Sequence, residues 1–496
     1  MTSNPDAGQP AWTLTSVADY LGAGSETVGK IGGLVATGIS QDSRQVLPGD
    51  IYAALPGSEH HGGEFVAEAA ARGAIAVISD RPTEILPTLV VGDPRKMLGP
   101  LASWLHRDPS SKLDMYGVTG TNGKTSTAFM LEAGLRAAGL RTGLVSGVCI
   151  RGPEGSRRAR RTTPEAGELQ TTLAGFVRDR VDGVAMEVSS HGLAQHRIVG
   201  TYFRVAAFTN LSRDHLDFHR TMKEYFETKA MLFTEKLCGA AVVGIDDAYG
   251  RALAARISVP SLTVSSSGRG ADVCATDIQA TRNGTVFTVR HGQWTKRVRL
   301  RLLGIHQVDN ALTAIASLRL GGVDVATAVE GIEELGAVPG RLERVDRGQD
   351  YLAFVDYVHN SSGQRRLFPY LRSLTANRLI VVVGATGGRD PGKRKPLGRN
   401  AGKFADVVIV TDEGPFHDDA FQLRDDVAAG AREAMHAEVV VVPDRGEALE
   451  IAVSKAKKGD TILVAGRGND RVMNYGGVEV PFGDREELER AVTDRG

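Results

Sequence analysis

Four nearly continuous apolar runs in the last third of the chain limit its fold most strongly. They are RLIVVVG (378–384), DVVIVTD (406–412), EVVVVPD (438–444) and DTILVAG (460–466). A strand with one face in water alternates apolar and polar residues, whereas a strand without this alternation has both faces buried. Such strands occur in parallel sheets that carry helices on both sides. The runs therefore predict a Rossmann-like, doubly wound α/β domain at the carboxyl end.

The rest of the chain also indicates α/β architecture. Short strand-like runs (DIYAAL, AIAVIS, TLVVG) alternate with an alanine-rich helical stretch near the amino end, and later runs (GVAMEV, RVAAFTN, GAAVVGI) recur at βαβ spacing. A β-rich stretch with an Asn-Gly turn signal follows. Pro339 and Gly340 then interrupt both patterns, as a hinge would. We expect three domains, at 1–112, 113–338 and 339–496, the central one a parallel sheet of P-loop ATPase type.

Composition excludes several classes of protein. The 59 lysines and arginines balance the 59 aspartates and glutamates, so no overall field favours nucleic acid or an anionic membrane. Cys149, Cys238 and Cys274 show no CxxC spacing, which argues against a disulfide framework or a zinc site. The amino end shows no signal-peptide pattern, and no apolar window approaches the length of a membrane span. We expect a cytoplasmic protein that binds neither nucleic acid nor membrane.

The segment GVTGTNGKTST predicts a polyphosphate-binding loop between a strand and a helix. Glycines allow backbone N–H groups to face phosphates, Lys124 can reach the β- and γ-phosphates, and Thr125 can bind magnesium. Val118 stands where the common GxxxxGK[ST] pattern has glycine, so the loop begins at Gly120 and is tighter. The loop predicts ATP binding and leaves kinase, hydrolase, motor and ligase open.

Three further segments contain candidates for metal chemistry or an unusual lysine. Glu187 ends an apolar strand, where its carboxylate could hold magnesium opposite Thr125. In TNLSRDHLDFH, either His215 or His219 could bind a second metal ion. Lys229 lies in a helical stretch among aromatic residues, and these residues alone favour a snorkelling side chain with its ammonium in water.

Eight motifs follow one another along nearly the whole chain: GTNGKTS, TTPE, EVSSHGLAQHR, TNLSRDHLDFH, YFETKAMLF, GIHQVDNALTA, VPGRLERVD and VDYVHN. In this order they resemble the Mur ligases, and most closely the branch of UDP-N-acetylmuramoyl-tripeptide synthetases. The resemblance implies an ATP- and Mg²⁺-dependent ligase of peptidoglycan assembly, acting as a monomer. ATP would convert a carboxylate of UDP-N-acetylmuramoyl-L-alanyl-D-glutamate to an acyl phosphate, and an amino-acid amine would attack it to form an amide.

The resemblance also assigns roles to individual residues. It implies that the catalytic and metal-binding residues are Lys124, Thr125, Glu187, His215 and Lys229. In the family this lysine is carbamylated, so the resemblance reverses the snorkelling interpretation of Lys229. For ATP it implies Gly120, Thr121, Asn122, Gly123, Lys124, Thr125, Ser126, His306, Asn310, Arg341 and Asp356. For the donor, bound partly by the amino-terminal domain, it implies Ser43, Arg44, Thr162, Thr163, Ser189, Gln195 and Arg197. For the acceptor, bound by the carboxyl-terminal domain, it implies Arg389, Glu413, Phe416, Gly466 and Asp470.

The acceptor segments depart from the family pattern. Diaminopimelate-using members carry DNPR where this chain has EGPF, so Phe416 replaces the arginine that clamps the distal carboxylate and Gly414 replaces the asparagine. The GKGHE motif is GRGND, Gln307 replaces an adenine-side asparagine, and HNSSG replaces the usual HTPDA. Lysine-using members keep the asparagine that Gly414 replaces, so the resemblance does not imply L-lysine either. These changes predict an apolar or cationic acceptor rather than diaminopimelate.

Two other interpretations remain open from the sequence. The same chemistry could serve a specialised peptide pathway with another donor, which the acceptor changes favour and the intact TTP and QHR segments oppose. The chain could also be a catalytically silent binding subunit, which the retained Lys124, Glu187, His215 and Lys229 oppose.

Overall fold

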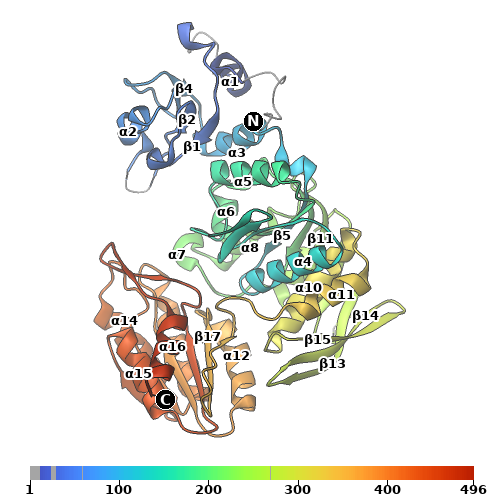
Figure 1. The fold of residues 1–496 in the computed structure, drawn as a ribbon, viewed down its shortest axis with the longest axis vertical. Helices are drawn as coiled ribbons and strands as arrows, with labels where there is room; N and C mark the ends of the chain where they lie inside the picture. Colours follow the sequence, from blue (N-terminus) through green and yellow to red (C-terminus); the bar gives the residue numbers. More distant parts are fainter. Residues whose placement is uncertain (1–11, 24–28, 58–59, 269, 496) are drawn as a thin grey trace. The chain divides into compact units, whose positions relative to one another are not determined.

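The structure is a computed structural model that describes residues 12–23, 29–57, 60–268 and 270–495. The chain folds into two compact units. The first unit comprises Met1–Met115, Arg141–Arg204 and Glu235–Cys238, and the second comprises Tyr116–Leu140, Val205–Thr234 and Gly239–Gly496. Figure 1 colours both units along the sequence.

The first unit begins with a small parallel sheet. Its strand order is β1 (Gly38–Ser40), β2 (Asp50–Ala53), β3 (Ala76–Ser79) and β4 (Thr88–Val90). Helices α1 (Leu14–Leu21) and α3 (Pro94–Leu105) pack their apolar faces on this sheet, and α2 (Val66–Ala71) contributes to a second small core. The predicted amino-terminal α/β unit is confirmed.

The first unit also contains strands from the middle of the chain. Strand β9 (Gly183–Glu187) pairs in parallel with β6 (Thr142–Val145), and β7 (Cys149–Gly152) and β8 (Gly155–Arg158) continue antiparallel. Helices α5 (Ala166–Arg178) and α6 (Ser190–Ala194) belong to the same part of the chain. Glu187 thus stands at the carboxyl end of a fully buried strand.

The second unit contains the strand that leads into the glycine-rich loop. Strand β5 (Asp114–Thr119) pairs in parallel with β10 (Phe203–Phe208), and both strands lie mainly in this unit. The sheet continues through β11 (Cys238–Gly244) and β12 (Ser261–Ser265) to the antiparallel strands β13 (Val273–Thr281), β14 (Gly284–His291) and β15 (Trp294–Leu300). Helix α4 (Lys124–Ala137) packs against α10 (His306–Leu320) and α11 (Val325–Glu334).

The carboxyl-terminal sheet also belongs to the second unit and has the order β16-β17-β21-β18-β19-β20. The four predicted runs form its parallel strands β18 (Leu379–Val383), β19 (Val407–Val410), β20 (Glu438–Val441) and β21 (Thr461–Ala465). Strand β17 (Leu352–Asp356) is parallel to β21, and the short β16 (Glu343–Arg344) is antiparallel to β17.

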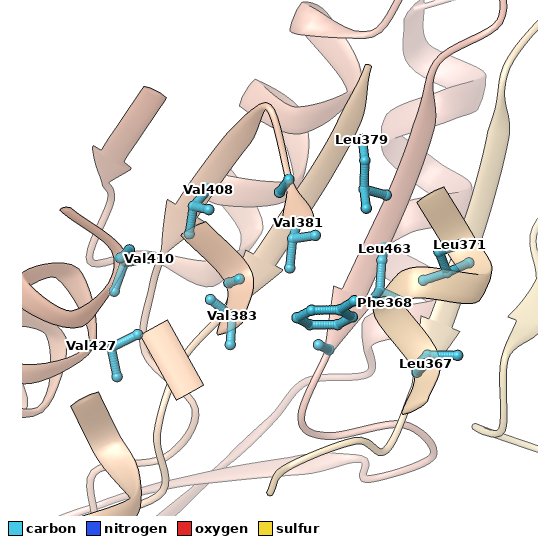
Figure 2. Close-up of a cluster of buried hydrophobic side chains, with 14 of the residues drawn as sticks. Leu367, Phe368, Leu371, Leu379, Val381, Val383, Val408, Val410, Val427 and Leu463 are labelled. Carbon is cyan, nitrogen blue, oxygen red and sulfur yellow. The ribbon is translucent and has the colours of Figure 1, made fainter. Parts of the chain in front are cut away.

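Helices bury both faces of this sheet. On one face, α12 (Ser361–Leu374), α13 (Arg394–Phe404) and α14 (Ala420–Glu433) contribute to a cluster that includes Phe368, Val381, Val408 and Val427 (Figure 2). On the other face, α15 (Arg445–Lys455) and α16 (Asp484–Arg495) contribute to a cluster that includes Ile380, Leu449 and Leu488. The α/β fold class and the doubly wound carboxyl-terminal part are confirmed, while the three domain boundaries stay predictions. Among the helices of the described ranges, none is long and apolar enough to span a bilayer.

A buried ion pair fixes α15 to α16. Arg445 donates from Nε to Asp484 Oδ1 at 2.7 Å and from Nη2 to Asp484 Oδ2 at 2.8 Å, and both side chains are 0% exposed. The Arg445 guanidinium also donates to the carbonyl oxygens of Asp412 and Ala465. Both buried charges of this pair therefore have a partner.

Arg445→Leu leaves the Asp484 carboxylate buried without its counter-charge, so we expect the free energy of unfolding to fall by about 3–5 kcal/mol. Urea denaturation followed by far-UV circular dichroism measures this loss. The control is Arg256→Ala, which removes an equally bidentate but half-exposed pair with Glu227 and should cost less than about 1 kcal/mol. Equal losses in the two variants would contradict the assignment.

Candidate functional site

The predicted phosphate loop joins β5 to α4, and its two glycines are sterically required. Gly120 has φ +145° and Gly123 has φ +91°. A Cβ on Gly120 would lie 1.9 Å from Thr209 Oγ1, and one on Gly123 would lie 2.2 Å from Asn310 Oδ1. Because neighbouring side chains lie this close to the backbone, the Cβ of any larger residue would clash at either position.

Two lysines converge on this loop. Lys124 Nζ donates to the carbonyl oxygens of Gly120 and Thr121, both at 2.9 Å. Lys229 Nζ donates to the same Gly120 oxygen at 2.9 Å and to Thr119 Oγ1 at 3.4 Å. Two lysine Nζ atoms therefore share one carbonyl oxygen at the base of the loop.

Lys229 is buried rather than snorkelling. The residue is 1% exposed, and its Nζ lies 4.8 Å from the centre of the Tyr225 ring. Burial, and then repulsion from Lys124, lower the pKa of Lys229 well below its ordinary value. The snorkelling interpretation is wrong because Lys229 lies on the buried side of its helix with Tyr225 and Phe226, which the sequence did not reveal.

The rest of the loop is anchored to the segment after β10. Thr121 N donates to Asn210 O at 2.8 Å, and Asn122 N donates to Asn210 Oδ1 at 3.1 Å. Thr125 and Ser126, in the first turn of α4, are 3% and 5% exposed. The loop is thus held by side chains and backbone outside it.

The predicted hinge reaches this loop. Arg341 Nη2 donates to Thr125 Oγ1 at 2.9 Å, and its guanidinium lies 4.5 Å from the centre of the Tyr357 ring. Asp356, at the end of β17, accepts from the backbone N–H groups of Leu342 at 2.6 Å and Val358 at 2.7 Å. Burial raises the pKa of Asp356. Asp356 therefore shapes the backbone around Arg341.

The predicted adenine-side residues begin α10. Asn310 Nδ2 donates to Gln307 Oε1 at 2.9 Å, and both side chains are buried. Burial, together with Arg366 and Arg341, lowers the pKa of His306 to about 3. The side chain of Gln307 is thus buried and hydrogen-bonded to Asn310. Asn310 in turn lies beside Gly123 of the phosphate loop.

A buried polar network around Asp214 was not predicted from the sequence. Asp214 Oδ2 accepts from Asn360 Nδ2 at 3.0 Å and lies 3.3 Å from His359 Nε2 and 3.9 Å from His215 Nε2. Burial alone would raise the pKa of Asp214, but His359, His215 and Lys393 together hold it well below its ordinary value. The signal in the sequence is that two polar dipeptides, Asp214-His215 and His359-Asn360, each follow an apolar strand.

Asn360 connects this network to the phosphate loop. It donates to Asn122 Oδ1 at 3.0 Å and caps α12 by accepting from Gly363 N at 2.9 Å. Asn122 Nδ2 in turn donates to Ser362 Oγ at 3.1 Å. The amide of Asn360 therefore contacts the loop, Asp214 and the start of α12 together.

The predicted donor residues lie in the first unit. Thr163 Oγ1 donates to Glu187 O at 2.9 Å and accepts from Ser189 N at 2.9 Å. Arg197 is buried, donates to Thr163 O at 3.0 Å and forms a 2.9 Å ion pair with Glu165. Gln195 Oε1 accepts from Arg197 Nη2 at 2.5 Å. These residues form one connected cluster.

The other predicted donor residues lie in the first unit, next in the chain to residues that line a groove. Ser43 Oγ donates to Glu68 Oε2 at 2.6 Å, and the exposed Arg44 forms a bidentate contact with Asp42. Thr162 lies beside Gly147. A groove of about 800 Å³ is lined by their neighbours in the chain, including Asp42, Gln45, Arg160, Arg161 and Glu165. Glu187 is 1% exposed and accepts from Gly147 N at 2.8 Å.

The five predicted acceptor residues line one pocket in the second unit. The pocket has a volume of about 210 Å³ and lies at the carboxyl ends of β17, β18, β19 and β21. Its lining includes Arg389, Glu413, Phe416, Gly466 and Asp470, together with Asp214 and His215 from the segment after β10. Ligands of open α/β sheets bind at this edge.

The residues around the phosphate loop fit a magnesium ion that is bound together with a nucleotide. In the described parts of the chain, no three His, Cys, Asp or Glu side chains gather closely enough to hold a metal ion on their own. Magnesium bound with a nucleotide needs one or two protein oxygens, because phosphates and water supply the remainder. The hydroxyl of Thr125, in the first turn after the loop, fits this requirement.

Comparison with known proteins agrees with this geometry. The chain matches three family profiles: "Mur ligase family, catalytic domain" at residues 35–101, "Mur ligase middle domain" at 118–318 and "Mur ligase, glutamate ligase domain" at 340–468. A UDP-N-acetylmuramoyl-L-alanyl-D-glutamate–2,6-diaminopimelate ligase of Streptomyces coelicolor is 40% identical over 494 residues, covering 97% of this chain and 96% of the relative.

Solved structures show the same fold. A UDP-N-acetylmuramoyl-L-alanyl-D-glutamate–2,6-diaminopimelate ligase has a TM-score of 0.65 at 28% identity, covering 94% of this chain and 96% of that one. The MurF ligase from Thermotoga maritima in complex with ADP has a TM-score of 0.69 at 20% identity, covering 92% and 98%, and this likeness concerns the fold alone.

Fold and loop define a nucleotide-binding α/β enzyme. The chain belongs to the Mur ligase family, and it is an ATP-dependent ligase that forms amide bonds.

The lowered pKa of Asp214 predicts a dependence of stability on pH. Between the unfolded value of about 3.9 and the lower native value, only the unfolded state binds the proton. The stabilisation is therefore complete above about pH 5 and is lost as the pH falls through the native pKa. In urea denaturation, the advantage of the wild type over Asp214→Asn should shrink below about pH 4.

The matched control is Asp494→Asn, which removes a carboxylate that is 64% exposed. A difference between wild type and Asp214→Asn that stays constant from about pH 6 to pH 3 would contradict the prediction.

Proposed function

We propose that this protein joins the amine of an amino acid to a carboxylate of a UDP-N-acetylmuramoyl-dipeptide, with release of ADP and phosphate. One observation carries this proposal. The pocket that holds the predicted acceptor residues is also lined by Asp214 and His215, whose segment lies against the phosphate loop. An amine in this pocket would stand beside the nucleotide site.

ATP activates the donor. The donor carboxylate attacks the γ-phosphorus and ADP departs, which yields an acyl phosphate. Lys124 exchanges the carbonyl oxygens of Gly120 and Thr121 for phosphate oxygens, and the N–H groups of the loop face the same anion. Arg341, already on Thr125 Oγ1, adds a guanidinium to the phosphates. His306, Asn310 and Asp356 keep their predicted contacts with the nucleoside.

Magnesium, when bound, would neutralise charge that develops on the transferred phosphate. Thr125 and Glu187 keep the predicted role of magnesium ligands, and His215 with Lys229 that of a second set. A protonated lysine cannot bind a cation, but a carbamate can. The lowered pKa of Lys229 favours the neutral amine, which can combine with CO₂ and release a proton to form this carbamate.

Amide formation follows. The neutral amine of the acceptor attacks the acyl carbon, the tetrahedral intermediate collapses, and phosphate leaves with the bonding electrons of its C–O bond. The amine loses one proton in this step, and the buried Asp214 carboxylate with His359 supplies acceptors at the pocket wall. Asn360 holds Asp214 in place.

We assign the donor to the first unit. Arg197, Gln195, Ser189 and the Thr162–Thr163 pair would hold its sugar and peptide, and Ser43 with Arg44 its uracil nucleotide. The 800 Å³ groove beside these segments has room for such a molecule, and Arg160 and Arg161 on its lining suit the diphosphate.

The acceptor pocket is where this chain departs from the pattern that the resemblance implies. The Streptomyces relative is named a diaminopimelate ligase, yet Phe416 lines this pocket where the resemblance expects an arginine. We propose that diaminopimelate is not the acceptor. A second candidate keeps the chemistry but serves a specialised peptide pathway with another donor, and the same substitution favours it.

Lys124→Ala should lower phosphate release that depends on both donor and amine by at least about 100-fold, because it removes one positioned cation from the transferred phosphate. A coupled phosphate assay with UDP-N-acetylmuramoyl-L-alanyl-D-glutamate and a panel of amino acids measures this. Lys403→Ala, on an exposed face of α13, is the control and should retain activity. Wild-type silence with every amine would reject this donor and favour the second candidate.

Asn360→Ala should lower kcat/KM for ATP about 10- to 100-fold, because it removes hydrogen bonds to a buried carboxylate and to the loop. The control is Asn400→Ala, whose side chain bonds the first turn of α12 through Ser361 rather than the loop. Steady-state kinetics compares the two. Equal losses would show that Asn360 acts only by holding α12.

A further inference from the structure

We propose that the acceptor is an amino acid with one carboxylate and a cationic side chain, whose distal cation is held by Phe416, Glu413 and Glu479. This inference rests on the proposed function and names the substrate class of its acceptor pocket. It decides between the apolar and cationic acceptors that the sequence left open.

The backbone fixes Phe416 at the pocket wall. Its N–H donates to Asn474 O at 2.9 Å, and its carbonyl accepts from Gly476 N at 2.6 Å, so the loop after β19 pairs with the hairpin β22 (Val472–Tyr475) and β23 (Val478–Pro481). The residue has φ +53°, a conformation that a bulky side chain rarely adopts without support. The hydrogen bonds to the hairpin supply this support.

The ring of Phe416 covers a gap left by glycine. A Cβ on Gly414 would lie 3.9 Å from Phe416 Cε2, so the ring occupies space beside a residue without a side chain. Phe416 is 40% exposed and lines the pocket. One face of an aromatic ring is therefore available to a ligand, and such faces attract cations.

Two carboxylates accompany this ring. Glu479 pairs with Asn474 across the hairpin, which places both side chains on the same face, and both line the pocket. Glu413 is 5% exposed, and its Oε2 lies 2.1 Å from the position of a Cβ on Gly466, so its carboxylate packs against a glycine of the pocket wall. Its Oε1 accepts from Thr386 Oγ1 at 2.9 Å.

The cationic groups of the lining have other partners, and Arg467, like the buried Arg445, also acts electrostatically on Glu413. Arg467 donates to the carbonyl oxygens of Val472 and Phe482, with its Nε 3.8 Å from Asp484. The guanidinium of Arg389 lies 3.9 Å from Asp217, and Lys393 acts on the carboxylate of Asp214. His215 and His359 also adjoin Asp214.

The pocket is thus electrically divided. Arg389 and Lys393, near Asp214 and Asp217, suit the α-carboxylate of an amino acid. The end formed by Phe416, Glu413 and Glu479 presents an aromatic face and two carboxylates, which repel a second carboxylate and attract an ammonium or guanidinium group. An apolar side chain would contact the ring but would not pair with Glu479, whereas Glu413 already has Arg445 and Arg467 nearby.

The test compares acceptors of similar length on the full chain with ATP, Mg²⁺ and the UDP-muramoyl dipeptide. L-lysine ends in an ammonium group, L-norleucine in a methyl group and L-2-aminoadipate in a carboxylate. Donor- and amine-dependent phosphate release should give L-lysine, L-ornithine or L-arginine a kcat/KM at least about 10-fold above norleucine. It should give 2-aminoadipate and meso-diaminopimelate values near background.

Substitutions test which residues cause the preference for a cationic acceptor. Glu479→Gln should reduce the ratio of lysine to norleucine turnover by about 3- to 10-fold, and Phe416→Arg should shift the preference towards 2-aminoadipate. Val478→Gln is the control, because this neighbouring residue on β23 is 65% exposed and lies outside the pocket lining. It should leave the ratio unchanged.

Each outcome decides the inference. Turnover fastest with norleucine, 2-aminoadipate or meso-diaminopimelate overturns it while the proposed function stands. A lysine preference that survives Glu479→Gln and Phe416→Arg unchanged overturns the assignment of residues. No turnover with any amine rejects the proposed function and this inference together.

Discussion

The contact of two lysine Nζ atoms with one carbonyl oxygen determines the chemistry of the nucleotide site. Lys124 and Lys229 both donate to Gly120 O, and repulsion from Lys124 adds to burial in lowering the pKa of Lys229. Lys124 can therefore remain the ammonium group that meets the phosphates, while Lys229 is biased towards its neutral form, and the cost of this arrangement is met by folding rather than during reaction. The glycines of the loop, the anchor at Asn210 and the guanidinium of Arg341 all serve to hold this arrangement.

Much of the fold followed from the sequence because its signals are local and strong. A strand buried on both faces has no polar alternation, and all four such runs form the predicted parallel strands. The phosphate loop was equally clear, since only glycine tolerates its backbone. The five acceptor residues were assigned by the family resemblance, and they line one pocket because the ends of parallel strands meet at one edge.

What the sequence concealed depends on contacts between distant segments. Asp214 and Asn360 are hydrogen-bonded to each other in a network that includes His359, yet they are 146 positions apart in the chain. No pattern along the sequence predicts a contact over such a separation. The burial of Lys229 was missed for a related reason, because aromatic neighbours surround both snorkelling and buried lysines alike. Tertiary packing decides between them. The interior position of Gln307 likewise depends on its partner Asn310, three residues along α10.

At Phe416 the conformation of the pocket wall does not depend on the side chain that the residue carries. Its left-handed conformation is maintained by main-chain hydrogen bonds to the β22–β23 hairpin, which do not involve its ring. A substitution at this position would therefore exchange an aromatic wall for a charged or polar one without moving the loop. Substrate choice in such an enzyme can diverge through very few evolutionary steps, while the machinery that activates the carboxylate is inherited intact.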